Sequence, residues 1–328
     1  MNVDPVALAA AQSDVRELVG SHSRTLADVV VRLLDDHAAN NHRLNLTDGL
    51  LDAGRRAQVI DVLNELADSN VVESYGSFDR FLEANAGHGS LFDPVADEVN
   101  NAADGNSRKK TFVEALKAAD PARATGPDPT MGQSILVDEY ALILSARVLP
   151  AVEAEIKAIA KAVGSSAKVS ARSKTAEDLV DKVGRMTRGS NNVRPRPHYR
   201  VGDAIDAVGT RITVADMSGL AAAFDAAKAY FGTGDGGRIL EIENMYASPK
   251  SAKPLYRVIS MVIAVEVDGK PYTFELQLTT ERASVAADLD HNTIFKPYVP
   301  INEVEQRTLR SVLEEAVAMD QLEMVNHA

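Results

Sequence analysis

A carboxylate and an amide lie two residues apart on a predicted strand, where their side chains point to one face. The dipeptide Asp268-Gly269 stands between two apolar, β-branched runs and predicts a hairpin, because its turn needs positive φ. On the second strand Glu275 and Gln277 share one face, and the leucines beside them share the other. The pair is typical of a site that rests on a core. A solvated sheet face is the alternative, and the hairpin taken alone favours it.

A second carboxylate interrupts another apolar run. Asp206 falls within a strand predicted at about residues 204–214, where an Asp is costly unless it is paired or binds a metal. A purely structural pairing with Arg211 is the alternative. Asp206 and Glu275 together supply the hard oxygen ligands that suit Mg²⁺ bridging the phosphates of a nucleotide.

Basic residues cluster just before this strand. On a helix predicted over residues 172–187, Lys174, Asp178 and Lys182 recur every four residues and so line one face. Two lysines with the nearby Arg172 suit a polyphosphate. A salt-bridged solvent face is the alternative reading of this helix.

The segment 182–200 holds no acidic residue and predicts an electropositive rim that attracts phosphates. A flexible basic loop is the alternative. The basic residues of the segment are Lys182, Arg185, Arg188, Arg194, Arg196 and Arg200.

Composition bounds the class of protein. The 328 residues include no Cys, which excludes disulfides and thiol catalysis and fits a cytoplasmic protein. Neither a signal peptide nor a membrane span is expected. The formal charge of −12 is uneven, with −10 in residues 1–150 and +6 in residues 151–200. This asymmetry predicts a helical, acidic domain over 1–150, of regulatory or unknown role, and a second domain over 151–328.

The predicted fold is α+β, a mixed β-sheet flanked by helices and preceded by a mostly α-helical domain. Apolar spacing predicts helices near 5–19, 24–38, 55–68 and 107–119, and a long helix over 134–163 with a kink or break at Pro150. The second half predicts helices at 217–231, 281–295 and 302–325 and a strand near 238–245, besides the hairpin.

Five motifs occur in the order and rough spacing of the RelA/SpoT-type (p)ppGpp synthetase family, which includes small alarmone synthetases and toxin-type relatives. The chain therefore resembles that family over about residues 165–300. The matching residues are Arg172, Lys174 and Lys182; Asp206, Gly209 and Arg211; Pro249, Lys250 and Tyr256; Glu275, Gln277 and Thr280; and Ala287, Leu289, Asp290, His291 and Lys296.

The resemblance implies a pyrophosphokinase that transfers the β,γ-pyrophosphate of ATP to the 3′-hydroxyl of GDP or GTP. It implies that Asp206 and Glu275 hold Mg²⁺ and that Glu275, with Gln277, acts on the acceptor hydroxyl. Tyr256 corresponds to the residue that stacks on the acceptor base. The remaining implied nucleotide-binding residues are Arg172, Lys174, Lys182, Arg211, Lys250 and His291.

The chain departs from the family pattern mainly on the acceptor side. Glu241 and Glu243 stand where basic residues are usual, Ser260 stands where the family has His, and Asp178 replaces a Ser. These changes leave two alternatives open. One is a relative that pyrophosphorylates adenine nucleotides or the 3′ end of tRNA, and the other is a non-catalytic member that binds nucleotide or a partner protein.

The sequence carries fewer motifs that bear on partners or on the N-terminal half. An antitoxin or another synthetase is a candidate partner, and the last predicted helix suits either core packing or an oligomer contact. Long family members carry an alarmone hydrolase with an His-Asp pair. Residues 1–150 contain His22, His37, His42 and His88 but no His-Asp dipeptide, and His37 and His42 are predicted to be surface or helix-end residues rather than metal ligands. No hydrolase is therefore expected.

Overall fold

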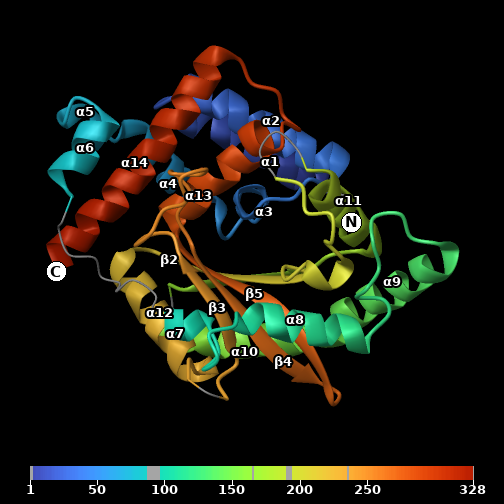
Figure 1. Cartoon of the computed structure of the whole chain (residues 1–328). Coiled ribbons are helices and arrows are strands. Elements are labelled where there is room, and N and C mark those ends of the chain that lie inside the picture. Colours follow the sequence, from blue (N-terminus) through green and yellow to red (C-terminus); the bar gives the residue numbers. More distant parts are fainter. Residues whose placement is uncertain (1–2, 87–96, 165, 190–193, 235, 328) are drawn as a thin grey trace.

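The computed structural model describes residues 3–86, 97–164, 166–189, 194–234 and 236–327 (Figure 1). Among these residues, no helix is both long enough and apolar enough to cross a membrane. His88 lies outside them, as does part of the predicted basic segment 182–200.

One five-stranded sheet organises the chain, in the order β1-β2-β5-β4-β3. The strand β2 runs parallel to β5, and the other neighbours are antiparallel. The sheet is therefore mixed, and its helices flank it on both sides, so the predicted α+β class is confirmed. The strands are β1 (Lys168–Ser173), β2 (Val208–Val214), β3 (Ile239–Asn244), β4 (Ile259–Val267) and β5 (Lys270–Thr280).

Helices make up most of the remaining described residues. Those of the N-terminal half are α1 (Pro5–Asp14), α2 (Arg24–Asn40), α3 (Asn45–Leu51), α4 (Arg56–Asp68), α5 (Val71–Ser74), α6 (Phe78–Ala84), α7 (Asp97–Asn100), α8 (Arg108–Ala119) and α9 (Met131–Ile143). Those that follow are α10 (Leu149–Val163), α11 (Ala176–Arg188), α12 (Met217–Phe231), α13 (Glu281–Asp290) and α14 (Glu303–His327). Short π-helical turns extend α1, α9 and α13, at Val15–Val19, Leu144–Val148 and His291–Phe295.

The two faces of the sheet differ in chemistry. One face is apolar and packs against α10 and α12, below the sheet in Figure 1. The other carries Glu275, Gln277 and their neighbours and faces α13, with α3 and α4 beyond it, above the sheet in Figure 1. Along β5 the apolar residues are buried, and Glu275 and Gln277 are only partly buried. The alternation that the sequence predicts for this strand is confirmed.

The hairpin forms where it was predicted. Asp268 and Gly269 both adopt positive φ, 53° and 71°, as a two-residue turn between twisted strands requires. The turn sets the pairing of β4 with β5, so that Ser260 lies opposite Gln277.

Two predicted boundaries before the hairpin are wrong. Arg172 belongs to strand β1, and the helix begins only at Ala176, because Thr175 caps it and Asp178 closes the capping box. Asp206 lies in a turn that precedes β2, not inside a strand spanning 204–214. Polar side chains suit both positions, since neither lies in a buried strand interior.

The predicted long helix starts at Met131, three residues early, because Thr130 caps it and Gln133 completes a capping box. It does not break at Pro150, which takes the second position of α10, directly after the π-helical turn. The π-helical turn accommodates Pro150, which has no backbone N–H to donate to the preceding turn. The predicted domain boundary at residue 150 falls inside this helical run, and the division into 1–150 and 151–328 stays a prediction.

Two apolar cores hold the described structure together. The first lies between the sheet and helices α9, α10 and α12. The second joins residues 11–66 of the N-terminal helices to residues 285–316 of α13, α14 and the segment between them. Leu309, Val312 and Leu313 of α14 are buried in this second core, which agrees with the core-packing reading of that helix.

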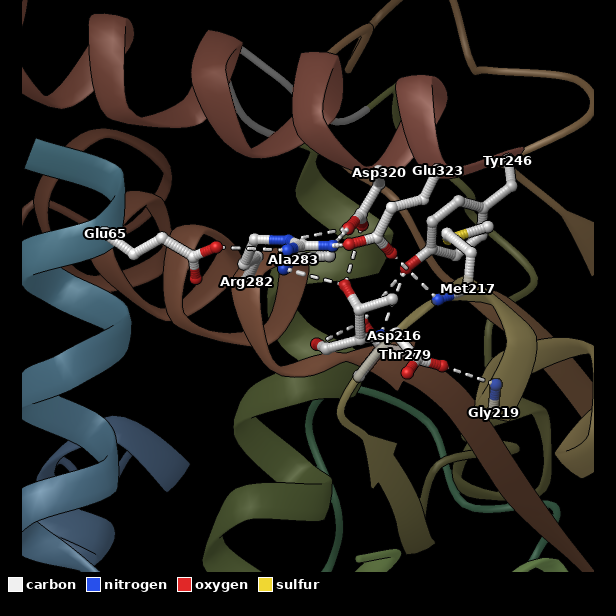
Figure 2. A network of polar contacts seen from close by, with 11 residues as sticks. Glu65, Asp216, Met217, Gly219, Tyr246, Thr279, Arg282, Ala283, Asp320 and Glu323 are labelled. Carbon is white, nitrogen blue, oxygen red and sulfur yellow. Dashed lines mark hydrogen bonds and ion pairs between the residues drawn. The ribbon is translucent and has the colours of Figure 1, made fainter. Parts of the chain in front are cut away.

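A buried arginine in the first turn of α13 connects that helix to α4 and α14 (Figure 2). The Nε of Arg282 donates to Asp320 at 3.0 Å, its Nη1 lies 3.3 Å from a carboxylate oxygen of Glu65, and its Nη2 donates to Glu323. Thr280 donates to the other oxygen of Asp320 at 2.7 Å. Burial raises the pKa of Asp320 to about 6 against the attraction of Arg282. The ionised Asp320 therefore depends on that cation.

Replacing Arg282 should destabilise the fold strongly. The substitution Arg282→Met leaves the carboxylate of Asp320 buried without its cation, a change that costs about 3–5 kcal/mol. Urea unfolding at pH 7 measures this loss. The matched control is Arg310→Met, because Arg310 forms an exposed i,i+4 pair with Glu314 on α14 and such pairs contribute less than ~1 kcal/mol. Equal losses in both variants would contradict the assignment.

Candidate functional site

The sheet register places the polar residues of three strands on one face. Gly209 of β2 lies opposite Glu275 of β5, and Arg211 lies opposite Gln277. Ser260 of β4 lies opposite Gln277 from the other side. Residues that pair directly across strands share a face, so these side chains meet. The polar face predicted for Glu275 and Gln277 on β5 thus continues onto β2 and β4.

Hydrogen bonds fix the carboxylate of Glu275 from both sides. Ser260 Oγ donates to its Oε1 at 2.8 Å, and Gln277 Nε2 donates to its Oε2 at 3.1 Å. The oxygen of Gln277 accepts from Nε and Nη2 of Arg211, at 3.2 and 3.0 Å. This network sets the amide orientation of Gln277, because its oxygen faces a guanidinium and its nitrogen faces a carboxylate.

Asp206 lies beside Glu275 and pairs with two lysines. Its carboxylate is 3.4 Å from Lys174 Nζ and accepts a hydrogen bond from Lys182. Arg211 does not pair with it; the guanidinium turns to Gln277, Ser284 at 2.9 Å and Asp288 at 3.5 Å. The structural pairing of Asp206 with Arg211, left open by the sequence, is therefore wrong.

The environment moves the acidities of the two carboxyls apart. Burial opposes ionisation of Asp206, but the charges of Lys182 and Lys174 outweigh it and lower the pKa of Asp206 to about 2. Burial and the negative charge of Asp206 raise the pKa of Glu275. Two neighbouring carboxyls with opposite shifts are typical of a site that divides acid–base roles. Asp206 is the permanent anion, and Glu275 is the stronger base.

A dense group of cations faces the two carboxyls. Burial and the charges of Arg185 and Lys174 lower the pKa of Lys296 to about 8. Burial and the charges of Lys296 and Arg172 lower the pKa of His291 to about 3, so its ring is neutral near pH 7. Cations that depress one another's pKa are stabilised in the charged form when an anion binds among them.

Of the other residues singled out by the sequence, Tyr256 lies at the site, and Lys250 and Asp178 form contacts elsewhere. Tyr256 lies at the site, where burial raises its pKa to about 12 and where the charges of Arg211 and Glu275 act on it. Lys253 approaches its ring to 5.7 Å. Lys250 is half exposed and pairs with Glu243 at 2.7 Å. Asp178 caps α11 and does not form the predicted row with Lys174 and Lys182.

Sequence reasoning missed Ser260 as a site residue and treated it only as a lost His. The signal was available, because a two-residue turn at Asp268-Gly269 fixes the partner of every residue in the hairpin. Ser284 and Asp288 of α13, which contact Arg211, carried no comparable signal.

The donor set fits Mg²⁺ held jointly with a ligand. No group of three or more His, Cys, Asp or Glu side chains within the described ranges could enclose a metal. Mg²⁺ usually binds one or two carboxylates together with substrate phosphates and water, and Asp206 and Glu275 match that pattern.

Known proteins similar to this chain are found among solved structures. No family model matches the chain, and no curated protein matches its sequence. Among solved structures, the chain is similar to small alarmone synthetase 1 from Bacillus subtilis bound to its product pppGpp, at 19% identity over 56% of this chain and 93% of that one, with a TM-score of 0.43.

Two further solved structures are similar to the same extent. A GTP pyrophosphokinase family protein from Streptococcus pneumoniae is 19% identical over 59% of this chain and 92% of its own, with a TM-score of 0.43. Small alarmone synthetase 2 from Bacillus subtilis is 19% identical over 57% and 93%, with a TM-score of 0.39. The likeness is one of fold, and the chemistry of the site has to follow from its own residues.

Binding of a polyphosphate should weaken as the pH rises through about 8. A bound polyanion raises the pKa of Lys296 above the value of about 8 in the free protein, so binding takes up a proton above that pH. Affinity for inorganic tripolyphosphate should fall roughly tenfold between pH 7.5 and 9.5, since one pKa unit corresponds to about 1.4 kcal/mol. Calorimetric titration at constant ionic strength measures the change.

The variant Lys296→Met should bind more weakly at pH 7.5 and lose most of this pH dependence. The matched control is Lys250→Met, because Lys250 is half exposed and already paired with Glu243. A pH dependence that persists in Lys296→Met would assign the proton uptake to another group.

Proposed function

We propose that the protein is a pyrophosphokinase that transfers the β,γ-pyrophosphate of ATP to the 3′-hydroxyl of a guanine nucleotide, GDP or GTP. The observation that carries the proposal is the pair Asp206 and Glu275, two neighbouring carboxyls with opposite pKa shifts beneath a cluster of cations. Transfer of phosphoryl groups needs charge neutralisation and positioning more than covalent chemistry, and this site supplies both.

The donor ATP would lie along the cations of β1, α11 and the π-helical turn after α13. Arg172 is exposed at the end of β1, and Lys174 and Lys182 are placed to exchange Asp206 for phosphate oxygens. Arg211 and Lys296 would complete the neutralisation. Asp206 and Glu275 would hold Mg²⁺, which would supply further neutralisation of the phosphate charge.

Glu275 would accept the proton of the acceptor hydroxyl. The ribose oxygen forms a bond to the β-phosphorus of ATP, the bond from that phosphorus to the α-phosphate oxygen breaks, and AMP leaves. A raised pKa makes Glu275 a better base than an ordinary glutamate. Ser260 and Gln277 hold its two oxygens in place, so the base enters the reaction already oriented.

The acceptor would lie on the side of Tyr256, whose ring lies at the site and suits stacking on a base. Here the chain supplies Glu241 and Glu243, which are neutralised by Lys109 at 2.5 Å and Lys250 at 2.7 Å. Adenine nucleotides and the 3′ end of tRNA are therefore the competing acceptors, because a lysine engaged by a glutamate is less available to acceptor phosphates.

Removing the base should abolish transfer without unfolding the protein. Glu275→Gln keeps the shape of the side chain, and its amide can accept from Gln277 and donate to Ser260, but it cannot take the proton, so we expect the rate to fall by about 10²–10⁴-fold. The measurement is transfer of label from γ-labelled ATP with Mg²⁺, with GDP, GTP, ADP and deacylated tRNA supplied separately. Circular dichroism checks that the variant is folded.

The matched control is Glu266→Gln, because Glu266 is an exposed carboxylate on the same hairpin. It should leave the rate unchanged. Label on ADP or tRNA alone would replace the acceptor and keep the reaction. No label on any acceptor, with ATP still bound, would overturn the enzymatic proposal in favour of a nucleotide-binding protein.

Ser260 should set the acidity of the base. Its hydrogen bond lowers the pKa of Glu275, so Ser260→Ala should raise that pKa and move the acid limb of the kcat/KM profile to higher pH. The shift should be about one pH unit, since a hydrogen bond to a charged group contributes about 1.5–3 kcal/mol. Ser260→Thr keeps the hydroxyl and should restore the parent profile; an unshifted limb in Ser260→Ala would show that Ser260 does not act on the base.

A further inference from the structure

A cavity opens on the polar face of the sheet at the end away from Asp206. It lies between helices α3, α4 and α13 and strands β1 and β2, and we call it the Arg55 pocket. Its polar lining consists of Asn45, Arg55, Lys168, Ser170, Thr213, Glu281 and Ser284. The cavity volume is about 40 Å³. By the measure in which one water needs roughly 10–15 Å³, that is room for about three waters or one tetrahedral oxyanion.

Arg55 brings an uncompensated positive charge to this pocket. Its backbone is bonded within the start of α4, but its side chain has no ion pair or hydrogen bond with the described parts of the chain, and its Nε is buried without a partner. A Cβ at Gly49 would lie 3.5 Å from Arg55 Nη2, an ordinary contact, so the guanidinium packs directly against α3. A buried N–H without an acceptor is costly, and an oxyanion would satisfy it.

The other charges of the pocket are already paired with each other. Lys168 lies 2.7 Å from Glu281 and also donates to Gln58. Gln58 in turn donates to both oxygens of Glu281, at 2.7 and 2.8 Å. The carboxylate of Glu281 is thus compensated before any ligand arrives, and the charge of Arg55 decides the sign of the pocket.

Ser284 connects the pocket to the candidate active site. Ser284 lines the pocket, and its Oγ accepts a hydrogen bond from Arg211 Nη1 at 2.9 Å. A hydroxyl that accepts one hydrogen bond still has its own proton to donate, and an anion in the pocket would be an acceptor for it. An anion that accepts this proton strengthens the bond from Arg211 and holds the guanidinium against Gln277.

We propose that the Arg55 pocket binds a small oxyanion of the size of inorganic phosphate and that its occupancy is coupled through Ser284 to Arg211. A volume of about 40 Å³ suits an anion of this size, and the ligand that we assign is the free anion. Binding at Arg55 stands independently of the enzymatic role; the effect on nucleotide rests on the proposed function. Coupling is reciprocal, so phosphate should tighten nucleotide binding and nucleotide should tighten phosphate binding equally.

The first experiment measures phosphate binding to the full chain by the rise in thermal midpoint at constant ionic strength, with tripolyphosphate present to fill the cations around Lys296. Phosphate should stabilise the parent and the control Arg43→Gln, which changes an exposed arginine of the same region. Arg55→Gln should bind at least tenfold more weakly. An unchanged phosphate response in Arg55→Gln would overturn the proposal.

A second variant guards against a folding defect in Arg55→Gln. Ser170→Val fills the pocket from β1 with a residue that suits a strand, and it should also lose the response. If Ser170→Val binds phosphate as the parent does, the pocket is not the binding site.

The coupling is tested by the affinity for a non-hydrolysable ATP analogue with and without phosphate. Phosphate should tighten that affinity about fivefold, at the low end of ordinary allosteric coupling. Ser284→Ala loses one donor to the anion, so it should bind phosphate more weakly than the parent, and at saturating phosphate it should lack the fivefold effect; if the effect persists, Ser284 is not the link. An analogue that does not bind at all would overturn the proposed function while leaving the phosphate result at Arg55 intact.

Discussion

The site depends on two carboxyls that lie close enough for each to feel the charge of the other. Like charges so placed ionise together only at a cost, and the chain meets that cost by giving one of them two lysines. Asp206 then stays charged and Glu275 becomes the weaker acid. The cations are needed for this division, and they also supply the positive field that a polyphosphate requires. One electrostatic constraint thus accounts for both halves of the site.

Helix α13 transmits that constraint to the rest of the molecule. Ser284 and Asp288 on this helix hold Arg211, and Asp288 also accepts a hydrogen bond from the backbone of Leu46 in α3 at 2.8 Å. At its first turn Arg282 is tied to α14. The N-terminal helices therefore reach the arginine of the site through a single intervening carboxylate. These helices therefore have a structural role at the site.

Much of the site was predictable because it is local in sequence. Hairpin chemistry at Asp268-Gly269 and period-two alternation were enough to place Glu275 and Gln277 on one face. The errors came from competing local rules: a Thr cap, unnoticed before Ala176, left Arg172 assigned to a helix. Which cation would pair with Asp206 could not be read, since that depends on how α11 packs over the turn. The Arg55 pocket joins segments more than 100 residues apart, and no pattern along the chain encodes such a meeting.

The core shared by the two ends of the chain also has a bearing on synthesis. Glu65 emerges from the ribosome 217 residues before Arg282, its partner across that core. At translation rates of about 5–20 residues per second, α13 and α14 follow helices α1, α2 and α4 by roughly 10–45 s. During that interval the apolar faces that α13 and α14 later cover are exposed to solvent or bound by a chaperone. A chain assembled in this order completes the surroundings of Arg211 only after α13 has been made.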